Sequence, residues 1–251
     1  MSKKKEARLA TIRQILTIEN RVKIVDLAKQ LHVTPETLRT DLNELESRNI
    51  IVREHGYARI VNAMTETPLA MRREENPELK KPIMVRAMKE IQDGMVVFLD
   101  AGSTVLLGAP FLSSKKDLTI VTNSIPLANQ CALMNLDIIF VGGVIFNNGL
   151  RTYGYFSDHM IDSMHFDVAI IGTDGIRNSK GLTSISEGDI SVKRHVINQS
   201  KVIIGVCDSS KFSTTARFEY CKFHEIDKLI TNQLTPDQVK QIKGVKEIIQ
   251  V

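Results

Sequence analysis

The chain has 251 residues, of which 43% are hydrophobic and 25% are charged. These fractions are close to the average of soluble globular proteins, and they exclude a disordered, collagen-like or fibrous coiled-coil protein. No apolar stretch approaches the ~20 residues that cross a bilayer. The basic N-terminus lacks the apolar core of a secretory signal, and three widely spaced cysteines fit a reducing compartment, so we expect a cytoplasmic protein.

Positive charge is concentrated at the start of the chain. Residues 1–62 hold 12 Lys and Arg against 8 Asp and Glu, a net charge of +4, whereas residues 63–251 are neutral. A small basic module on a neutral body predicts an anionic partner, of which nucleic acid is the commonest. We therefore expect a DNA-binding domain at 1–62, a linker at 63–80 and a larger effector-binding sensor domain at 81–251.

The first sixty residues predict a helix-turn-helix. Apolar residues at helical spacing indicate helices over 4–18 and 24–31, and Thr34 with Pro35 begins a third helix as N-cap and first helical residue. The third helix presents short polar side chains and one long cation opposite its buried leucines, which suits base reading in a major groove. Its candidate DNA-binding residues are Thr34, Glu36, Thr37, Arg39, Thr40 and Asn43.

Two short strands follow, over 50–54 and 57–61, and His55 with Gly56 supplies the turn between them. A hairpin directly after a recognition helix gives the winged form of the motif. Arg53, His55 and Arg59 place cationic or titratable groups on this wing, where they suit contacts to phosphates. The pattern leaves open the alternative of an ordinary hairpin beside a solvent-exposed helix face.

The segment 62–82 carries three prolines and dense charge, which is typical of a linker, with a short helical stretch around 69–75. We expect Pro82 in the first turn of the next helix. Apolar strands then alternate with helical segments, which predicts a Rossmann-like, mostly parallel α/β sheet covered by helices. The expected strands are 96–99, 119–122, 138–141, 168–171, 202–206, 229–231 and 248–251.

Small, polar or charged residues follow nearly every expected strand, and ligands of such sheets bind beyond the carboxyl ends of the strands. Glycines and hydroxyls that open a helix make a phosphate cradle, while carboxylates and amides suit sugar hydroxyls. Lysine and arginine side chains add positive charge. The candidate effector-binding residues are Asp100, Gly102, Ser103, Thr104, Asn123, Ser124, Gly142, Gly143, Arg151, Asp174, Glu187, Lys193 and Lys211.

The sequence offers little support for a cofactor. It contains neither a P-loop nor a G-x-G-x-x-G motif after the first strand, which disfavours a nucleotide cofactor. Cys221 and His224 form a lone pair without the ligand spacing of a metal site. We expect no bound cofactor or metal.

Residues 33–61, VTPETLRTDLNELESRNIIVREHGYARIV, resemble the DNA-binding domain of the DeoR family of transcriptional regulators. The family pattern has a Thr-Ile-Arg-Arg-Asp-Leu core, a Leu-Glu segment and a His-Gly-Gly wing. Thr40 stands here in place of the second arginine, and Tyr57 in place of the second wing glycine. The operator sequence therefore does not follow from the resemblance.

The resemblance extends to the sensor domain. DAGST at 100–104, TNS at 122–124, VGG at 141–143, GTDG at 172–175 and DSSKF at 208–212 look like the matching blocks of that domain, as do Glu187 and Lys193. The family domain is similar to sugar-phosphate isomerases of the ribose-5-phosphate isomerase type. The resemblance therefore implies a phosphorylated sugar, or a related phosphorylated metabolite, as effector.

Two functions from different classes fit these features. The first is a repressor of a carbohydrate-use operon that binds double-stranded operator DNA, without membrane attachment, as a homodimer or homotetramer. The second is a sugar-phosphate isomerase or deaminase with an appended DNA-binding domain, because a carboxylate near a lysine can abstract a proton beside a carbonyl. The basic helix-turn-helix favours the regulator over the enzyme.

Overall fold

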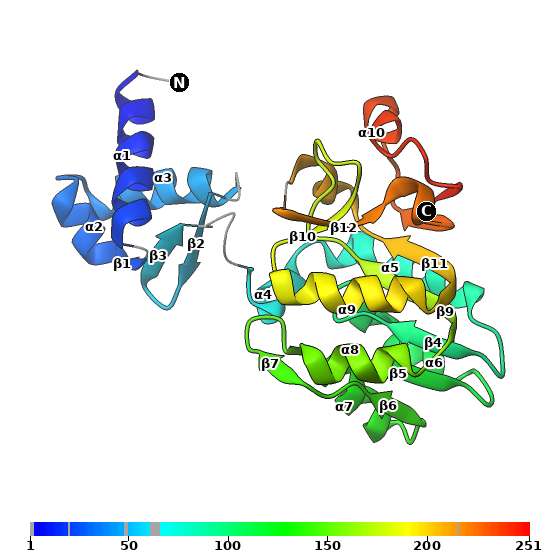
Figure 1. Ribbon diagram of the computed structural model, residues 1–251. Coiled ribbons are helices and arrows are strands. Elements are labelled where there is room, and N and C mark those ends of the chain that lie inside the picture. The colour runs from blue at the N-terminus through cyan, green and yellow to red at the C-terminus, as the bar shows by residue number, and fades with distance from the viewer. Residues whose placement is uncertain (1–2, 20, 48–49, 61–65, 215) are drawn as a thin grey trace. The chain divides into compact units, whose positions relative to one another are not determined.

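The computed structural model describes residues 3–19, 21–47, 50–60, 66–214 and 216–251 (Figure 1). The chain divides into two compact units, residues 1–65 and 66–251. Residues 66–80 of the expected linker belong to the second unit, whereas its residues 63–65 lie outside the described part. Among the described residues, no helix is long and apolar enough to cross a membrane.

The first unit is a winged helix-turn-helix. Strand β3 lies between β1 and β2 in a small antiparallel sheet, and Leu27, Leu38 and Leu42 are buried in the core beside it. The three expected helices and the hairpin are confirmed, although Val61 at the expected end of the hairpin lies outside the described residues. The elements are α1 (Lys3–Glu19), β1 (Arg21–Lys23), α2 (Ile24–Gln30), α3 (Pro35–Ser47), β2 (Ile51–Glu54) and β3 (Tyr57–Ile60).

Local chemistry explains the boundaries of these elements. The Thr34 hydroxyl accepts a hydrogen bond from the backbone N–H of Thr37 at 3.2 Å and so caps α3. At the hairpin turn, His55 and Gly56 both have positive φ, 46° and 83°, as the tightest two-residue turns require. Both features place the exposed face of α3 and the hairpin tip on a rigid frame.

The second unit is built on a seven-stranded sheet of order β14-β13-β11-β9-β4-β5-β6. Every neighbouring pair in it is parallel. All seven carboxyl ends therefore lie at one edge, and the seven strands expected from the sequence are confirmed. They are β4 (Val96–Leu99), β5 (Thr119–Thr122), β6 (Ile138–Phe140), β9 (Phe166–Gly172), β11 (Ser200–Val206), β13 (Lys228–Thr231) and β14 (Glu247–Gln250).

Helices cover both faces of the sheet, which is why its strands are apolar on both sides (Figure 1). Phe98 packs on one face with α8 (Tyr155–Asp162) and α9 (Glu187–Asn198). Its neighbours Val97 and Leu99 pack on the other face. The helices there are α5 (Pro77–Ala87), α6 (Ala109–Leu112) and α7 (Ile125–Leu133).

The sequence analysis missed several short elements of this unit. Two antiparallel pairs lie outside the main sheet, and three of their four strands lack a continuous apolar run that would predict them. The short helix α4 was expected, and α10 was not. The elements are β7 (Val144–Phe146), β8 (Arg151–Tyr153), β10 (Gly181–Ser184), β12 (Phe218–Lys222), α4 (Leu69–Glu74) and α10 (Pro236–Gln241).

The expected position of Pro82 is wrong. Helix α5 begins earlier, at Pro77, which follows Asn76 in the left-handed conformation at φ 48°. Proline is favoured at the first helical position because its missing N–H has no partner there in any case. Pro82 lies inside the helix, and its side chain is exposed.

A buried charge in the first unit gives a stability test. The Asp41 carboxylate is fully buried on α3 and accepts two hydrogen bonds from the guanidinium of Arg8 on α1, one of them at 3.0 Å. Asp41→Asn replaces one acceptor oxygen by an NH2 group, which removes one of the two bonds and weakens the other, so we expect a loss of about 1–3 kcal/mol of unfolding free energy. Urea-dependent hydrogen exchange of residues 35–47 measures it. The exposed Asp26→Asn serves as control and should change this value by less than about 0.5 kcal/mol.

Candidate functional site

One face of α3 is free to meet a ligand. Glu36, Arg39, Thr40 and Asn43 are exposed, while Leu38, Asp41, Leu42 and Leu45 occupy the buried face. Thr37 is half-buried, and its hydroxyl lies 2.9 Å from that of the exposed Thr34. The Thr40 hydroxyl donates to the Glu36 carbonyl at 3.1 Å. The structure thus brings the six candidate residues of this helix to one surface with Arg39 as its long cation.

The two wing arginines are already paired. Arg53 donates from Nε to Glu46 at 2.9 Å, and Arg59 donates to Glu54 at 3.1 Å. His55 is exposed at the hairpin tip. A phosphate contact by either arginine would therefore share the guanidinium with its carboxylate partner or displace that partner. The sequence analysis did not anticipate these pairs, in which the glutamates lie seven and five residues from the arginines along the chain.

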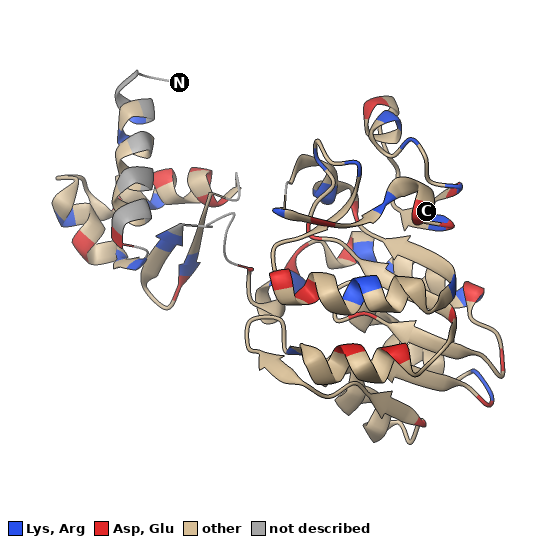
Figure 2. Ribbon diagram, in the orientation of Figure 1, with Lys and Arg blue, Asp and Glu red and all other residues tan. Residues whose placement is uncertain are grey.

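Strand β1 adds two cations that the sequence analysis did not select. The Arg21 guanidinium lies 4.0 Å from the centre of the Tyr57 ring, and the Lys23 ammonium lies 5.9 Å from it. Both side chains belong to exposed residues of the three-stranded sheet, where basic residues are visible in Figure 2. The tyrosine in place of a wing glycine therefore holds positive charge beside the hairpin through cation–π contacts.

In the second unit, strand ends and neighbouring elements enclose one polar cavity. Its volume is about 30 Å³, close to that of a single water molecule. Eight of the candidate effector residues line it: Asp100, Gly102, Ser103, Thr104, Arg151, Asp174, Lys193 and Lys211. The other lining residues, not selected from the sequence, are Glu66, Arg72, Ala101, Gly172, Thr173 and Asp189.

Asp100 fastens the strand ends together. One oxygen accepts the backbone N–H of Ala101 at 2.8 Å, and the other accepts that of Gly172 at 2.9 Å. The Lys193 ammonium lies 3.1 Å from the same carboxylate. Since both of its oxygens are engaged within the chain, Asp100 organises the cavity wall rather than offering a free acceptor for a sugar hydroxyl.

Arg151 is the centre of a buried ionic network. Its two terminal nitrogens donate to the two carboxylate oxygens of Glu66, both at 2.7 Å, and its Nε lies 2.8 Å from Asp189. Asp189 in turn lies 2.9 Å from Lys193, one helical turn along α9. Arg151 is only 3% exposed and packs over the Phe146 ring. Glu66, Asp189 and the Phe146 ring therefore fix the position of the Arg151 guanidinium.

The network fixes the ionisation of its members. Burial alone would lower the pKa of Lys193, but Asp100 and Asp189 outweigh it and raise this pKa well above the ordinary value. Burial alone would raise the pKa of Asp189, but Arg151 and Lys193 hold it below its usual range. These groups are therefore charged at neutral pH, which favours their ion pairs over proton exchange.

Several polar groups of the cavity have no protein partner. The hydroxyls and backbone N–H groups of Ser103 and Thr104 make no hydrogen bond to the described residues. Nor does the Lys211 ammonium form an ion pair with any part of the chain that the structure describes. Hydrogen-bond donors and an ammonium group that line one cavity without protein partners are suited to binding an anion.

Five candidate effector residues do not line the cavity. The backbones of Asn123 and Ser124 pair with β8, with a bond of 3.0 Å from the Thr152 N–H to the Asn123 carbonyl, and so they position Arg151. Glu187 is exposed at the start of α9. Gly142 and Gly143 lie at the end of β6, where a Cβ on Gly143 would lie 2.3 Å from the Ser157 hydroxyl. They shape the chain rather than present donors to the cavity.

The cavity residues that the sequence analysis did not select differ in whether the sequence contains a pattern that indicates them. Asp189 lies four residues before Lys193, so helical spacing places the two on one face of α9, whereas Glu187 lies six residues away. That spacing could have selected Asp189. Glu66 and Arg72 come from the segment read as a linker, and nothing in its pattern indicates burial. Among the described residues, no cluster of three metal-ligating side chains occurs.

Both units match models of one family. Residues 8–63 match the DeoR-like helix-turn-helix domain, and residues 75–233 match the DeoR C terminal sensor domain. The HTH-type transcriptional repressor GlcR of Bacillus subtilis is 35% identical over 235 residues, which cover 93% of this chain and 90% of the relative. The glycerol-3-phosphate regulon repressor of Escherichia coli is 29% identical, over 86% of each chain.

Among solved structures, ribose 5-phosphate isomerase A of Methanocaldococcus jannaschii superposes with a TM-score of 0.41. The superposition covers 55% of each chain at 19% identity. This likeness is too weak to carry an argument about the cavity.

The two neighbouring glycines offer a matched stability test. Gly143 has φ 147°, and a Cβ there would lie 2.6 Å from the Tyr153 carbonyl oxygen, whereas nothing lies within 4 Å of a Cβ on Gly142. We expect Gly143→Ala to cost about 1–3 kcal/mol and Gly142→Ala less than about 0.5 kcal/mol. Thermal unfolding of both variants measures the difference. Equal losses would contradict the packing role of Gly143.

Proposed function

Since the chain belongs to the DeoR family of transcriptional regulators, we propose that it represses a carbohydrate-use operon under control of a phosphorylated sugar or a related phosphorylated metabolite. The names of its relatives support this assignment, because one regulates a glycerol-3-phosphate regulon. The chain's own residues support each half of it separately.

The observation that carries the effector half is the set of unpartnered donors at the strand ends. Ser103 and Thr104 offer hydroxyls and backbone N–H groups beside Lys211, and the cavity also contains the guanidinium groups of Arg72 and Arg151. Such a site suits a phosphate ester, whose oxygens accept several charge-assisted hydrogen bonds at once. The preference for a phosphate over a neutral sugar follows from this density of donors.

The DNA-binding half depends on the exposed face of α3. Short side chains there allow close approach to base edges, and Arg39 is long enough to reach a guanine or a phosphate. Arg21 and Lys23 beside Tyr57 supply phosphate contacts next to the hairpin. A symmetric dimer or tetramer would present two such faces to paired half-sites.

To control DNA binding, the effector must bind one conformation of the regulator more tightly than another. A ligand with equal affinity for both conformations does not change the equilibrium between them. We propose that effector binding releases the operator. The sensor cavity lies wholly in the second unit, so the signal travels through the chain that joins it to the first unit.

The charges in the cavity favour binding over catalysis. A general base needs a carboxylate that can accept a proton from a substrate. Asp100 and Asp189 instead pair with Lys193, and Asp174 accepts hydrogen bonds from the Ser184 hydroxyl at 3.2 Å and from a backbone N–H. We propose that the domain senses a sugar phosphate without turning it over, and turnover by the purified protein would contradict this.

Arg39→Ala tests the DNA-binding face. If Arg39 contacts a base, the variant should lose about 1–3 kcal/mol in affinity for a duplex selected by the wild-type protein. Fluorescence anisotropy at fixed salt measures the loss. Lys243→Ala removes the same charge from an exposed position of the second unit and should bind the duplex like wild type. Unchanged affinity of Arg39→Ala would remove Arg39 from the reading surface.

A thermal shift screen of phosphorylated against free sugars tests the effector site. The correct phosphorylated ligand at 100-fold excess over its Kd should stabilise the second unit by about 2.7 kcal/mol. Ser103→Ala and Lys211→Ala should lose this shift and keep their DNA affinity, whereas the control Lys243→Ala should keep both. Stabilisation by unphosphorylated sugars alone would overturn the proposed anion site.

A further inference from the structure

The second unit begins with a segment that is anchored at the cavity. This entry segment, residues 66–74, follows directly on residues 61–65 and contains α4. Leu69 is buried, and its N–H donates to the carbonyl of Asn148 at 2.8 Å. The Asn148 side chain donates back to the carbonyl of Glu66 at 3.2 Å. The entry segment is therefore fastened to the loop between β7 and β8.

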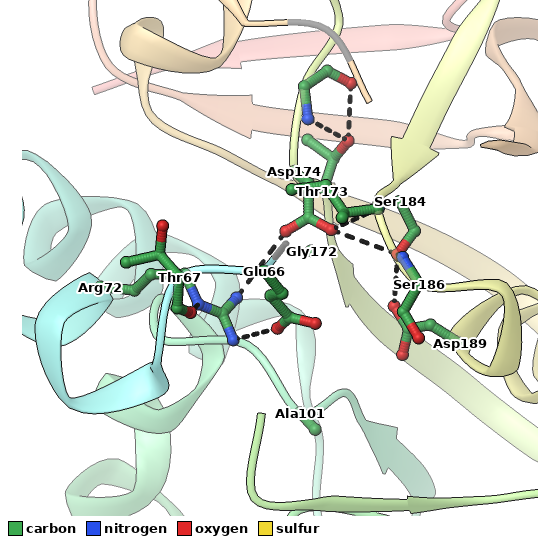
Figure 3. Close-up of polar contacts among 12 residues, drawn as sticks. Glu66, Thr67, Arg72, Ala101, Gly172, Thr173, Asp174, Ser184, Ser186 and Asp189 are labelled. Carbon is green, nitrogen blue, oxygen red and sulfur yellow. Dashed lines mark hydrogen bonds and ion pairs between the residues drawn. The ribbon is translucent and has the colours of Figure 1, made fainter. Parts of the chain in front are cut away.

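The second anchor of the entry segment is the Glu66 carboxylate, which the arginines of the cavity hold as they would hold a bound anion. Glu66 is 2% exposed and accepts the two parallel bonds from Arg151 together with one from Arg72. Figure 3 shows Arg72 between Glu66 and Asp174, whose carboxylate lies 3.7 Å from it. Arginine side chains also commonly hold phosphate groups through paired hydrogen bonds of this kind.

The cavity has neither the space nor the charge for a sugar phosphate while Glu66 stays in place. Its volume of about 30 Å³ is far below the roughly 300–1,000 Å³ of ligand pockets. Its walls carry four cations and four carboxylates, which balance. A phosphate ester brings a further charge of about −1.5 to −2, and burying this uncompensated charge would be costly. One carboxylate has to leave.

The hydrogen bonds single out which carboxylate leaves most easily. Asp100 and Asp174 each accept backbone N–H groups, and Asp189 accepts the Ser184 hydroxyl at 2.9 Å. Moving Asp100 or Asp174 would leave the backbone N–H of Gly172 or Ile185 without its partner. Moving Asp189 would remove a carboxylate from the buried Lys193 ammonium. Within the described residues, Glu66 is bonded through its carboxylate to arginines alone, and arginines can turn to a phosphate.

We propose that Glu66 is an internal anion that occupies the effector site, and that the phosphate group of the effector displaces it. The phosphate takes over the arginines and adds the donors of Ser103, Thr104 and Lys211. The entry segment then loses its carboxylate anchor, immediately next to the residues that lead to the DNA-binding unit. This inference rests on the proposed function, because it assigns the regulation of that same cavity.

Hydrogen exchange of the full-length wild-type protein tests the displacement directly. Inorganic phosphate is the probe, with sodium chloride at equal ionic strength as reference. Amides of residues 66–74 should exchange several-fold faster at saturating phosphate, while those around Ser103 and Thr104 should be protected. Phosphate that binds but leaves exchange in 66–74 unchanged or slower would overturn the displacement and leave the proposed function intact.

Glu66→Gln supplies a second test. A ligand that no longer competes with the internal carboxylate should bind more tightly, so we expect the affinity for inorganic phosphate to rise on the order of tenfold in calorimetry. Exchange in 66–74 should also be faster without phosphate. Glu74→Gln makes the same change at an exposed position of α4 and should match wild type in both measurements. An unchanged phosphate affinity of Glu66→Gln would contradict the competition.

The remaining outcomes separate the two proposals. Loss of charge alone can raise phosphate affinity, so a gain in Glu66→Gln supports displacement only together with faster exchange in the wild type. If neither protein binds phosphate, the proposed anion site falls and this inference falls with it. If Glu66→Gln does not fold, the wild-type exchange experiment decides the question alone.

Discussion

Arg151 is the charge around which the sensor unit is organised. A buried guanidinium is tolerated only where anions surround it, because removing one partner from a buried ion pair costs several kcal/mol. Its partners come from the entry segment and α9, and it stands on β8, whose register is set by Asn123 and Ser124. The entry segment, α9 and β8 therefore all pack around this one guanidinium group. A ligand that changes its ion pairs affects the packing of all three elements.

The parallel sheet supplies the frame that makes this arrangement possible. Two helical layers bury both faces of the strands, so polar side chains can gather only where the strands end. The 3-10 turn after β4 leaves the N–H groups of Ser103 and Thr104 unpaired, as helix starts do. The same cavity therefore contains unpaired donors that can bind a ligand and an ionic network that supports the structure.

The sequence predicts the fold of this chain better than its site. Apolar runs of three to five residues with polar ends indicated all seven strands of the sheet, because burial on both faces leaves a strong pattern. Of the residues predicted at strand ends, those that follow β4, β9 and β11 line the cavity. Glu66 and Arg72 were not predicted as site residues because their burial depends on Arg151, which is distant in sequence. Asp189 was not selected, although its spacing of four residues from Lys193 places both side chains on one face of α9.

The place of Glu66 in chain order has an entropic consequence. If its anchor is lost, up to nine further residues join the stretch that connects the two units. In an oligomer, a longer connection lowers the effective concentration of one DNA-binding unit around another. An oligomer would then bind paired half-sites with lower affinity although no atom at the protein–DNA contact had changed. A metabolite could in this way weaken operator binding only by lengthening the connection between the two units.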